Sequence, residues 1–202
     1  MKFAGFLTLV CLASGVLAAG EDHLLAGAQL FRERHFQEAY VEFMVASRLG
    51  AGGDAAWYAA ATLVKLRRPE DALEAFAAAE RAAPSAADPL LDYYRALACY
   101  DARLFLCADA LLDGVGDRTG PRIGAQARKM RADIAALLSS EPSVDSIDWY
   151  HSRGEEARKG GRHALVALYY REASALAARR PDHHRQAEAR ASLSGLRKEL
   201  AP

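Results

Sequence analysis

The sequence predicts an all-α protein built from stacked antiparallel helical hairpins, and three observations support this fold class. Alanine, the strongest helix former, is the most frequent residue, with 44 copies among 202, and Asn is absent. Apolar residues recur at spacings of three and four, as in Ala39, Phe43, Ala46 and Leu49, which is the period of an α-helix. Glycine and proline interrupt these stretches with short breaks, and helices joined by short loops pack as antiparallel neighbours.

Start and stop signals divide the chain into successive helices. The breaks are expected at Gly50 to Gly53, Pro69, Pro84 to Pro89, Gly114 to Pro121, Pro142, Gly160 with Gly161, and Pro181. The helices between them are expected at 21–33, 36–49, 54–66, 69–82, 88–101, 104–114, 121–139, 145–159, 161–179 and 182–199. Taken in pairs, these segments form five hairpins.

The first residues have the pattern of a signal peptide. Lys2 precedes a long uncharged run, small residues end that run, and Glu21 follows shortly after. We therefore predict a signal peptide at 1–18, cleaved after Ala18, and a periplasmic or secreted mature domain at 19–202. The alternative is a retained membrane anchor, but the run is short for a span of about 20 apolar residues, so we expect no stable membrane span after cleavage.

Export changes the interpretation of the cysteines. Removal of the signal would leave Cys99 and Cys107, an even pair in a compartment that permits disulfides. The two flank a turn expected around 101–104, so a bridge across one hairpin is sterically conceivable. The alternative is that both pack between helices as small apolar side chains. The sequence leaves the two interpretations open.

A pattern of small and aromatic residues recurs every 33 to 36 residues, the scale of helical repeat arrays. The recurring sets are Phe36, Ala39, Phe43 and Ala46; Pro69, Ala72, Phe76 and Ala79; and Phe105, Ala108, Leu112 and Val115. Trp57, Ala60 and Ala61 precede the second set, and Leu97 and Ala98 precede the third. A weaker copy comprises Tyr150, Gly154, Ala157, Gly161, Val166, Tyr170, Ala173 and Leu176. Small residues at a crossing let two helices approach closely, while aromatic residues fill the space between hairpins.

On these residues the chain resembles the tetratricopeptide repeat (TPR) family, whose motif runs aromatic, Leu, small, then aromatic, small, aromatic, small and finally proline. The best copies span 21–51, 54–84 and 88–116, and a weaker one spans 145–180. The segment 121–139 fits less well and is interpreted as a spacer, and 182–199 as a C-terminal capping helix.

The resemblance implies a right-handed α-solenoid with a concave surface that binds an extended peptide or a partner helix. It also implies that the first helix of each hairpin supplies the partner-facing side chains. The residues at these positions are Tyr58, Thr62, Lys65, Arg95, Cys99 and Arg103.

The motifs of common catalytic sites are missing from the sequence. It contains no glycine-rich phosphate loop, His-Glu-x-x-His, Cys-x-x-Cys or Gly-x-Ser-x-Gly motif, nor a paired-carboxylate signature. The one suggestive group for a metal is Asp182, His183 and His184 with His151 and His163. Adjacent histidines on a helix point about 100° apart, however, and Asp182 suits a helix N-cap after Pro181. We therefore expect no catalytic residues, no metal site and no cofactor.

Charge is balanced overall but uneven along the chain. Lys plus Arg and Asp plus Glu each number 26; residues 19–149 contain 14 basic and 20 acidic residues, and residues 150–202 contain 11 and 6. A basic C-terminal part could face an acidic partner, a polyanion or a membrane surface. Acidic residues are interleaved there without alternating aromatics, so we favour an ordinary solvated surface and expect no nucleic-acid partner.

These observations predict an exported, non-catalytic adaptor or assembly scaffold in the cell envelope, whose partner is another protein or peptide. The high alanine content favours a bacterial source and hence the periplasm. The alternative is a self-assembling accessory subunit of an envelope, secretion or motility complex, which would form an oligomer. An enzyme with a cryptic site is the least favoured class, because repeat folds sometimes host sites that no short motif reveals.

Overall fold

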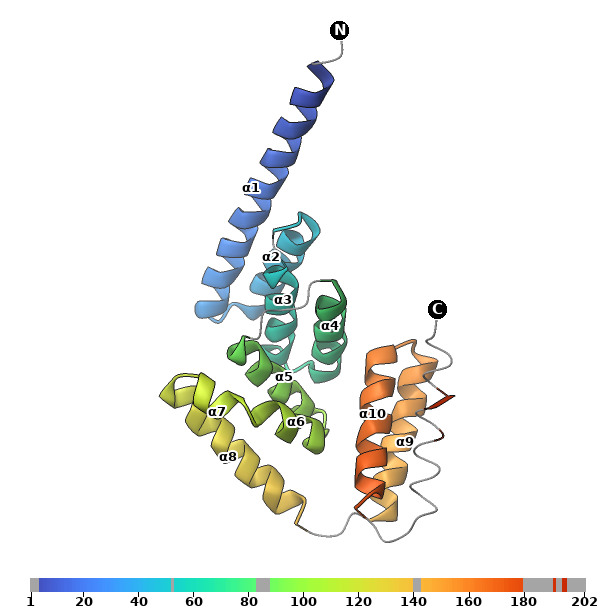
Figure 1. Cartoon of the computed structure of the whole chain (residues 1–202). Coiled ribbons are helices and arrows are strands. Elements are labelled where there is room, and N and C mark those ends of the chain that lie inside the picture. The colour runs from blue at the N-terminus through green and yellow to red at the C-terminus, as the bar shows by residue number, and fades with distance from the viewer. Residues whose placement is uncertain are drawn as a thin grey trace. The chain divides into compact units, whose positions relative to one another are not determined.

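A computed structural model describes the backbone of residues 4–51, 53–82, 88–139 and 143–179 and three positions beyond them, with side chains from Ala18 onward except Val144 (Figure 1). Every secondary-structure element in these ranges is an α-helix, which confirms the all-α class. Within the same ranges no helix is both long and apolar enough to cross a membrane. The capping helix predicted at 182–199 lies almost wholly outside them. The chain divides into two compact units, residues 1–91 and 92–202.

The first unit consists of four consecutive helices, each packed against the next (Figure 1). They are α1 (Ala4–Arg32), α2 (Phe36–Arg48), α3 (Asp54–Lys65) and α4 (Pro69–Ala82). The last three begin and end within a residue or so of the predicted bounds. The first begins at Ala4 instead of 21, because the alanine- and leucine-rich run before Glu21 contains no proline that would end a helix.

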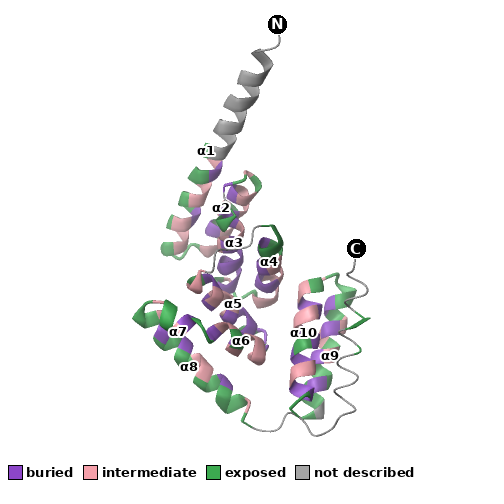
Figure 2. Cartoon of the chain, in the orientation of Figure 1, coloured by how far each residue is buried: buried purple, intermediate pink, exposed green. Residues whose placement is uncertain are grey.

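The core of the first unit forms where α2 packs between α1 and α3. Phe43 is only 2% exposed and clusters with Ala39 and Ala59. Gly27 of α1 lies directly against the Phe43 ring, since an added Cβ would approach two ring carbons to 2.8 Å. In α3 the buried positions run without interruption from Ala59 to Val64 (Figure 2), which is the pattern of a helix covered on all sides.

The second unit contains the remaining helices. They are α5 (Pro89–Asp101), whose first turn belongs to the first unit, α6 (Phe105–Leu112), α7 (Val115–Arg118), α8 (Pro121–Leu137), α9 (Val144–Lys159) and α10 (His163–Ala177). The α9 and α10 helices pack together, and α6 contacts α7, α8 and α10. A single helix was predicted at 104–114. The structure instead ends α6 at Leu112 and starts the short α7 after Gly114.

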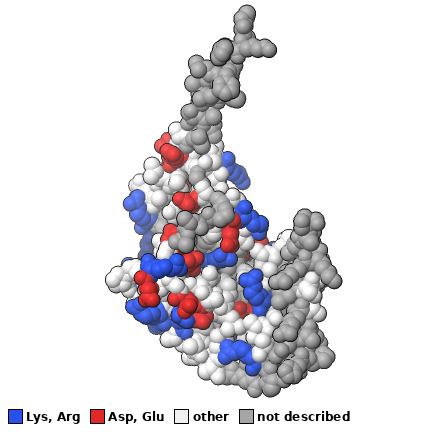
Figure 3. Space-filling model, viewed as in Figure 1, with Lys and Arg blue, Asp and Glu red and all other residues white. Residues whose placement is uncertain are grey.

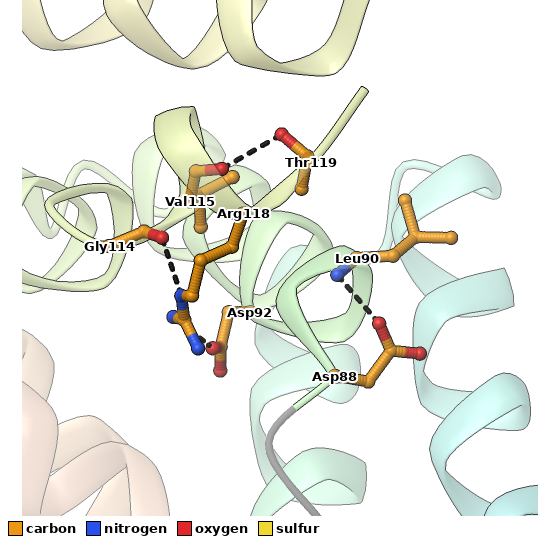
Figure 4. A network of polar contacts seen from close by, with 7 residues as sticks. All are labelled: Asp88, Leu90, Asp92, Gly114, Val115, Arg118 and Thr119. Atoms are coloured by element: carbon orange, nitrogen blue, oxygen red, sulfur yellow. Dashed lines mark hydrogen bonds and ion pairs between the residues drawn. The ribbon is translucent and has the colours of Figure 1, made fainter. Parts of the chain in front are cut away.

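A polar network holds the α6–α7 connection against α5 (Figure 4). The Arg118 guanidinium donates to the Gly114 carbonyl (2.6 Å) and to the Asp92 carboxylate (3.3 Å), and the Thr119 hydroxyl donates to the Val115 carbonyl at 2.8 Å. Earlier in the chain, at the start of α5, the Asp88 carboxylate accepts a hydrogen bond from the Leu90 N–H (2.8 Å). The side chains thus satisfy backbone groups that the ends of α5 and α7 leave open.

The α8 helix packs on α6 and α7 even though its segment lacks the repeat pattern. Arg131 pairs with Asp109 (2.9 Å) and Asp113 (2.8 Å) on the α6 side. An added Cβ on Gly124 would come within 2.6 Å of the Gly116 carbonyl oxygen, so this position requires glycine. Burial along α8 is partial, with Ala127 and Ile134 inside.

The connections α1–α2, α3–α4, α5–α6 and α9–α10 share one backbone conformation, and Gly50 after α2 has a similar one. Arg34, Arg67, Arg103 and Gly161 all have positive φ, between 58° and 69°. At each turn, the N–H of the positive-φ residue donates to the carbonyl three residues earlier. The N–H of the next residue donates to the carbonyl five residues earlier, and these second bonds are 2.8–3.0 Å long. This pair of bonds defines the Schellman motif that ends an α-helix. The residue after the positive-φ position then supplies the first carbonyl of the following helix.

A small and a large residue stand in the same register around each of these turns. The pairs are Gly27 with Phe43, Ala60 with Phe76, Ala96 with Leu112, and Gly154 with Tyr170, each sixteen residues apart and with the positive-φ residue seven after the small one. All eight residues are buried. Gly154 lies against the Tyr170 ring as Gly27 lies against Phe43. The same hairpin unit therefore occurs four times in the described chain.

The left-handed turn yields a stability prediction. Arg34→Gly should raise the free energy of unfolding by about 0.5–1 kcal/mol, because glycine adopts positive φ without the steric cost of a Cβ. Ala78→Gly, at an exposed helical position of α4, should lower it by about the same amount. Urea titration followed by circular dichroism measures both. Destabilisation by Arg34→Gly as large as that by Ala78→Gly would contradict this account of the turn.

The small-residue register yields a second prediction. Gly154→Ala should lower the free energy of unfolding by about 1–3 kcal/mol, because the new methyl group overlaps the Tyr170 ring. Adding Tyr170→Leu should recover part of that loss, since an alanine opposite a leucine is the pair found at Ala96 and Leu112. Thermal and urea unfolding of the single and double variants test this. No recovery in the double variant would exclude ring overlap as the cause.

Candidate binding site

The second unit contains a cavity of about 460 Å³ that opens to solvent. Four parts of the chain build it: the α5–α6 turn with the start of α6, the end of α8, the first turns of α9, and the end of α10. The lining residues are Arg103, Phe105, Leu137, Leu138, Ser143, Asp145, Ser146, Trp149, Tyr150 and Leu176. The volume lies in the range of pockets that hold small ligands or a few residues of a peptide.

The cavity wall exposes large apolar groups. Leu137 is 54% exposed and Trp149 is 36% exposed; they are two of the five large apolar side chains that face solvent in the described residues. The Trp149 ring is held edge-on by Tyr150 (centroids 4.9 Å apart) and Tyr169 (6.1 Å). An indole fixed by its neighbours but open on one side is a suitable anchor for a partner.

Arg103 is placed at the rim of this wall by the left-handed turn. Its guanidinium carbon lies 5.6 Å from the Trp149 ring centroid, within the range of a cation–π interaction. Its backbone carbonyl accepts the Tyr150 hydroxyl. None of the described carboxylates forms an ion pair with Arg103. The guanidinium therefore remains able to bind an anionic group that enters the cavity.

The first turn of α9 forms a polar part of the lining. The Ser143 hydroxyl accepts the Ser146 N–H (3.1 Å) and caps the helix. Asp145 lies in the same turn, where the helix dipole favours a negative charge. The cavity thus presents one cationic group, one anionic group and hydroxyls around an apolar floor.

A buried carboxylate ties α10 to α6 beside the cavity. Glu172 is 2% exposed, and its oxygens accept the N–H groups of Leu106 (2.7 Å) and Cys107 (3.1 Å). Burial raises the pKa of Glu172 to about 7, against the opposing effect of the backbone N–H groups. The α6 helix has no side-chain cap of its own, so Glu172 satisfies donors at its first turn.

The charge of Glu172 also acts on the hydroxyl of Tyr150. Burial is the main cause that raises the pKa of the Tyr150 hydroxyl, and the Glu172 charge adds to it. Tyr150 therefore stays protonated at physiological pH and donates its hydrogen bond to Arg103 throughout. Tyr150 of α9 thus holds the α5–α6 turn, and Glu172 of α10 holds the start of α6.

The structure distributes the predicted partner-facing residues over both units. Three of the predicted partner-facing residues lie in the second unit. Arg103 lines the cavity, Arg95 lies partly buried on α5, and Cys99 is fully buried. Cys107 is partly buried, and both cysteines are thiols. The prediction that Cys99 faces a partner was wrong, because its side chain points into the α5–α6 packing.

Three predicted residues lie on α3 in the first unit. Lys65 is exposed at the end of the helix, and Tyr58 is partly buried with its ring 5.6 Å from that of Phe43. Thr62 is 0% exposed, and its hydroxyl donates to the Tyr58 carbonyl at 2.7 Å. The prediction that Thr62 contacts a partner was therefore wrong, because α3 is covered on all sides at this position.

Charged side chains are intermixed on the face shown in Figure 3. On α9, Arg158 pairs with Glu155 (2.8 Å) and Arg153 pairs with Glu156. These two arginines of the basic C-terminal region therefore pair with acidic neighbours on their own helix. Such exposed pairs contribute little to stability but reduce the net field of the surface.

No group of three or more His, Cys, Asp or Glu side chains in the described ranges is arranged to hold a metal ion. Asp182, His183 and His184 lie outside those ranges.

Neither a protein-family model, nor a curated protein, nor a solved structure matches this chain.

The sequence did not identify most of the cavity residues. Leu137 and Leu138 lie in the segment that was interpreted as a spacer, and Trp149 stands one residue before the predicted repeat position Tyr150. Glu172 carried a usable signal, because it is the one acidic residue among the buried positions Tyr169, Ala173 and Leu176 of α10. An acidic residue on an apolar helix face needs a buried partner.

The raised pKa of Glu172 predicts a pH dependence. Since the folded-state pKa (about 7) exceeds the ordinary value of 4.5, the folded state binds the proton more tightly, and the free energy of unfolding should fall as pH rises between about 4.5 and 7. The contribution is at most ~3 kcal/mol. Urea unfolding from pH 5 to 8 should show a shallower dependence in Glu172→Gln and an unchanged one in Glu156→Gln, on the exposed side of α9. Equal slopes in wild type and Glu172→Gln would contradict the assignment.

Proposed function

We propose that this protein is an exported, non-catalytic adaptor of TPR-like architecture, which binds a segment of another protein in the cavity of its second unit. The observation that carries the proposal is the cavity itself: an exposed, immobilised Trp149 next to Arg103, whose guanidinium has no carboxylate partner among the described residues. The export part rests on the signal-peptide pattern at 1–18.

The recurring hairpin supports the TPR-like architecture. In that family a small residue of the first helix packs beneath an aromatic or large residue of the second. Gly27 lies against Phe43 and Gly154 against Tyr170 in this way, and Ala60 with Phe76 and Ala96 with Leu112 stand in the same register. Their common turn keeps the second helix in one register. A stacked array of such hairpins is a right-handed solenoid, whose surfaces bind extended peptides.

The chemistry of the lining defines the kind of segment that fits. The apolar floor of Phe105, Leu137 and Leu176 suits one large apolar side chain, which Trp149 would cover. Arg103 at the rim favours a carboxylate next to that side chain, and Asp145 and the α9 hydroxyls accept backbone N–H groups of an extended strand. The expected occupant is a peptide segment with a large apolar residue beside an acidic one.

Affinity recovery with variants of the full chain tests the proposal. Wild-type protein incubated with cell-envelope extract and cross-linked should recover a stoichiometric foreign partner, and Trp149→Ala should weaken binding of that purified partner by about 30-fold or more, as loss of a buried aromatic anchor does. Leu25→Ala removes an apolar side chain of the first unit that is more exposed than Trp149 (68% against 36%) and should have no effect.

Charge reversal provides a matched pair of variants. Arg103→Glu should weaken partner binding at least about tenfold by placing a negative charge where a carboxylate docks. Arg34→Glu makes the same change at the equivalent turn of the first unit, with the same backbone conformation, and should leave binding intact. Equal affinities for both variants, or a single self-associated species on light scattering with no foreign partner, would reject the cavity as the binding site.

A further inference from the structure

One side of α10 contacts the ends of two other helices of the second unit. Glu172, Leu176 and Arg179, the last just beyond the helix end, are spaced by four and three residues, which places them along one side of the helix. The Glu172 carboxylate accepts N–H groups in the first turn of α6. The Arg179 guanidinium donates to the Leu138 carbonyl at the end of α8 (2.5 Å). Leu176, between the two, lines the cavity, so polar contacts of one helix flank its apolar floor.

Each contact is matched to the charge of the helix end that it meets. The first N–H groups of α6 and the last carbonyl groups of α8 have no partners within their own helices. Such groups give a helix a positive start and a negative end. A carboxylate therefore meets the positive end of α6, and a guanidinium meets the negative end of α8. Apart from α9, only α6 packs extensively on α10 within the described ranges, so these two contacts are a large part of what holds α10 in place.

The α9 helix is anchored at a different point. Its Tyr150 hydroxyl donates to the Arg103 carbonyl in the α5–α6 turn. Burial is the main cause that raises the pKa of this hydroxyl, so the bond does not change with pH near neutrality. The α9 and α10 helices pack on each other and therefore move together. The hairpin thus has one constant contact that can serve as a pivot, and two contacts on the α10 side that can dock and undock.

We propose that the α9–α10 hairpin is a clamp on the cavity, which pivots at the bond from Tyr150 and closes when Glu172 and Arg179 dock on α6 and α8. Undocking of α10 would move Leu176 away from the α8 wall and widen the cavity. The clamp rests on the proposed function only for the kind of segment that it grips. Its closure follows from contacts within the chain.

The protonation state of Glu172 controls the closure. Docking leaves this residue 2% exposed, and the rise of its pKa to about 7 means that the cost of burying the charge exceeds the gain from the N–H groups. In the open state the carboxyl is in water and has its ordinary pKa of 4.5. The closed state therefore binds the proton more tightly, and the clamp loosens as pH rises from about 4.5 to 7. The ratio of closed to open molecules should fall at most about 300-fold over this window.

Other charged and titratable groups surround Glu172. Its charge acts on the Tyr150 hydroxyl of α9, the Cys99 thiol of α5 and the Cys107 thiol of α6. The cations that act on the same thiols are Arg95 of α5 and Arg171 of α10, which keep their charge throughout this window. Cys107, whose own N–H binds Glu172, is therefore replaced in a control variant.

Hydrogen exchange of the full chain tests the clamp, because the amides of Leu106 and Cys107 donate directly to Glu172. Their exchange is followed by NMR between pH 5 and 8 and corrected for the intrinsic effect of pH on amide exchange. We expect the protection of both amides to fall at least about tenfold as pH rises, because opening of the clamp exposes them. Amides of α2, in the first unit, should show no such fall.

Variants separate the clamp from a local effect of one carboxylate. Glu172→Gln should abolish the pH dependence at both amides, whereas Glu156→Gln and Cys107→Ala should retain it. Arg179→Ala should lower the protection of the same amides about threefold or more, although its side chain binds α8 and not α6. Arg158→Ala removes only an ion pair within α9 and should leave their protection unchanged.

Two results would overturn the clamp. One is protection at Leu106 and Cys107 that stays constant with pH in the wild type or varies equally in Glu172→Gln. The other is unchanged protection in Arg179→Ala, which would show that the two contacts act independently. Neither result affects the proposed binding site, because exchange is measured without a partner. Unchanged partner affinity in Trp149→Ala would reject that site and leave the clamp intact.

Discussion

The left-handed turn between paired helices is the constraint on which the rest of the structure depends. It ends one helix and starts the next within three residues, so it sets which residue of the second helix meets the small residue of the first. Three of the four positions are occupied by arginine, although glycine would fit with less strain. Packing between buried pairs such as Gly27 and Phe43 must therefore outweigh that strain.

The cavity depends on the same constraint. The turn at Arg103 presents both a carbonyl to Tyr150 and a guanidinium to Trp149. The helix that follows begins without a side-chain cap, and Glu172 from a distant helix supplies the missing acceptors. A position that serves only to connect two helices in the first unit thus becomes part of the cavity lining in the second.

The sequence predicted most helices but few of the site residues, and the reason is geometric. Glycine and proline mark the end of α2, the start of α3 and both ends of α4, and the 3.6-residue period defines the buried faces of these helices. Which face of a helix stays exposed in the assembled chain depends on its neighbours, and an error of one residue rotates the assignment by about 100°. Thr62 and Cys99 were misassigned for this reason. The cavity was missed because its wall combines α8, which lacks the repeat pattern, with Trp149, which stands one residue before the repeat position Tyr150.

The carboxylate of Glu172 also has a consequence for how the chain folds. In the first unit each helix contacts its neighbour in sequence, so its contacts close short loops. The Glu172 bonds join residues 65 and 66 positions apart, and the entropy of closing that loop must be met before α6 is capped. We therefore expect the second unit to complete its structure after the first, with the contacts of Glu172 among the later ones to form.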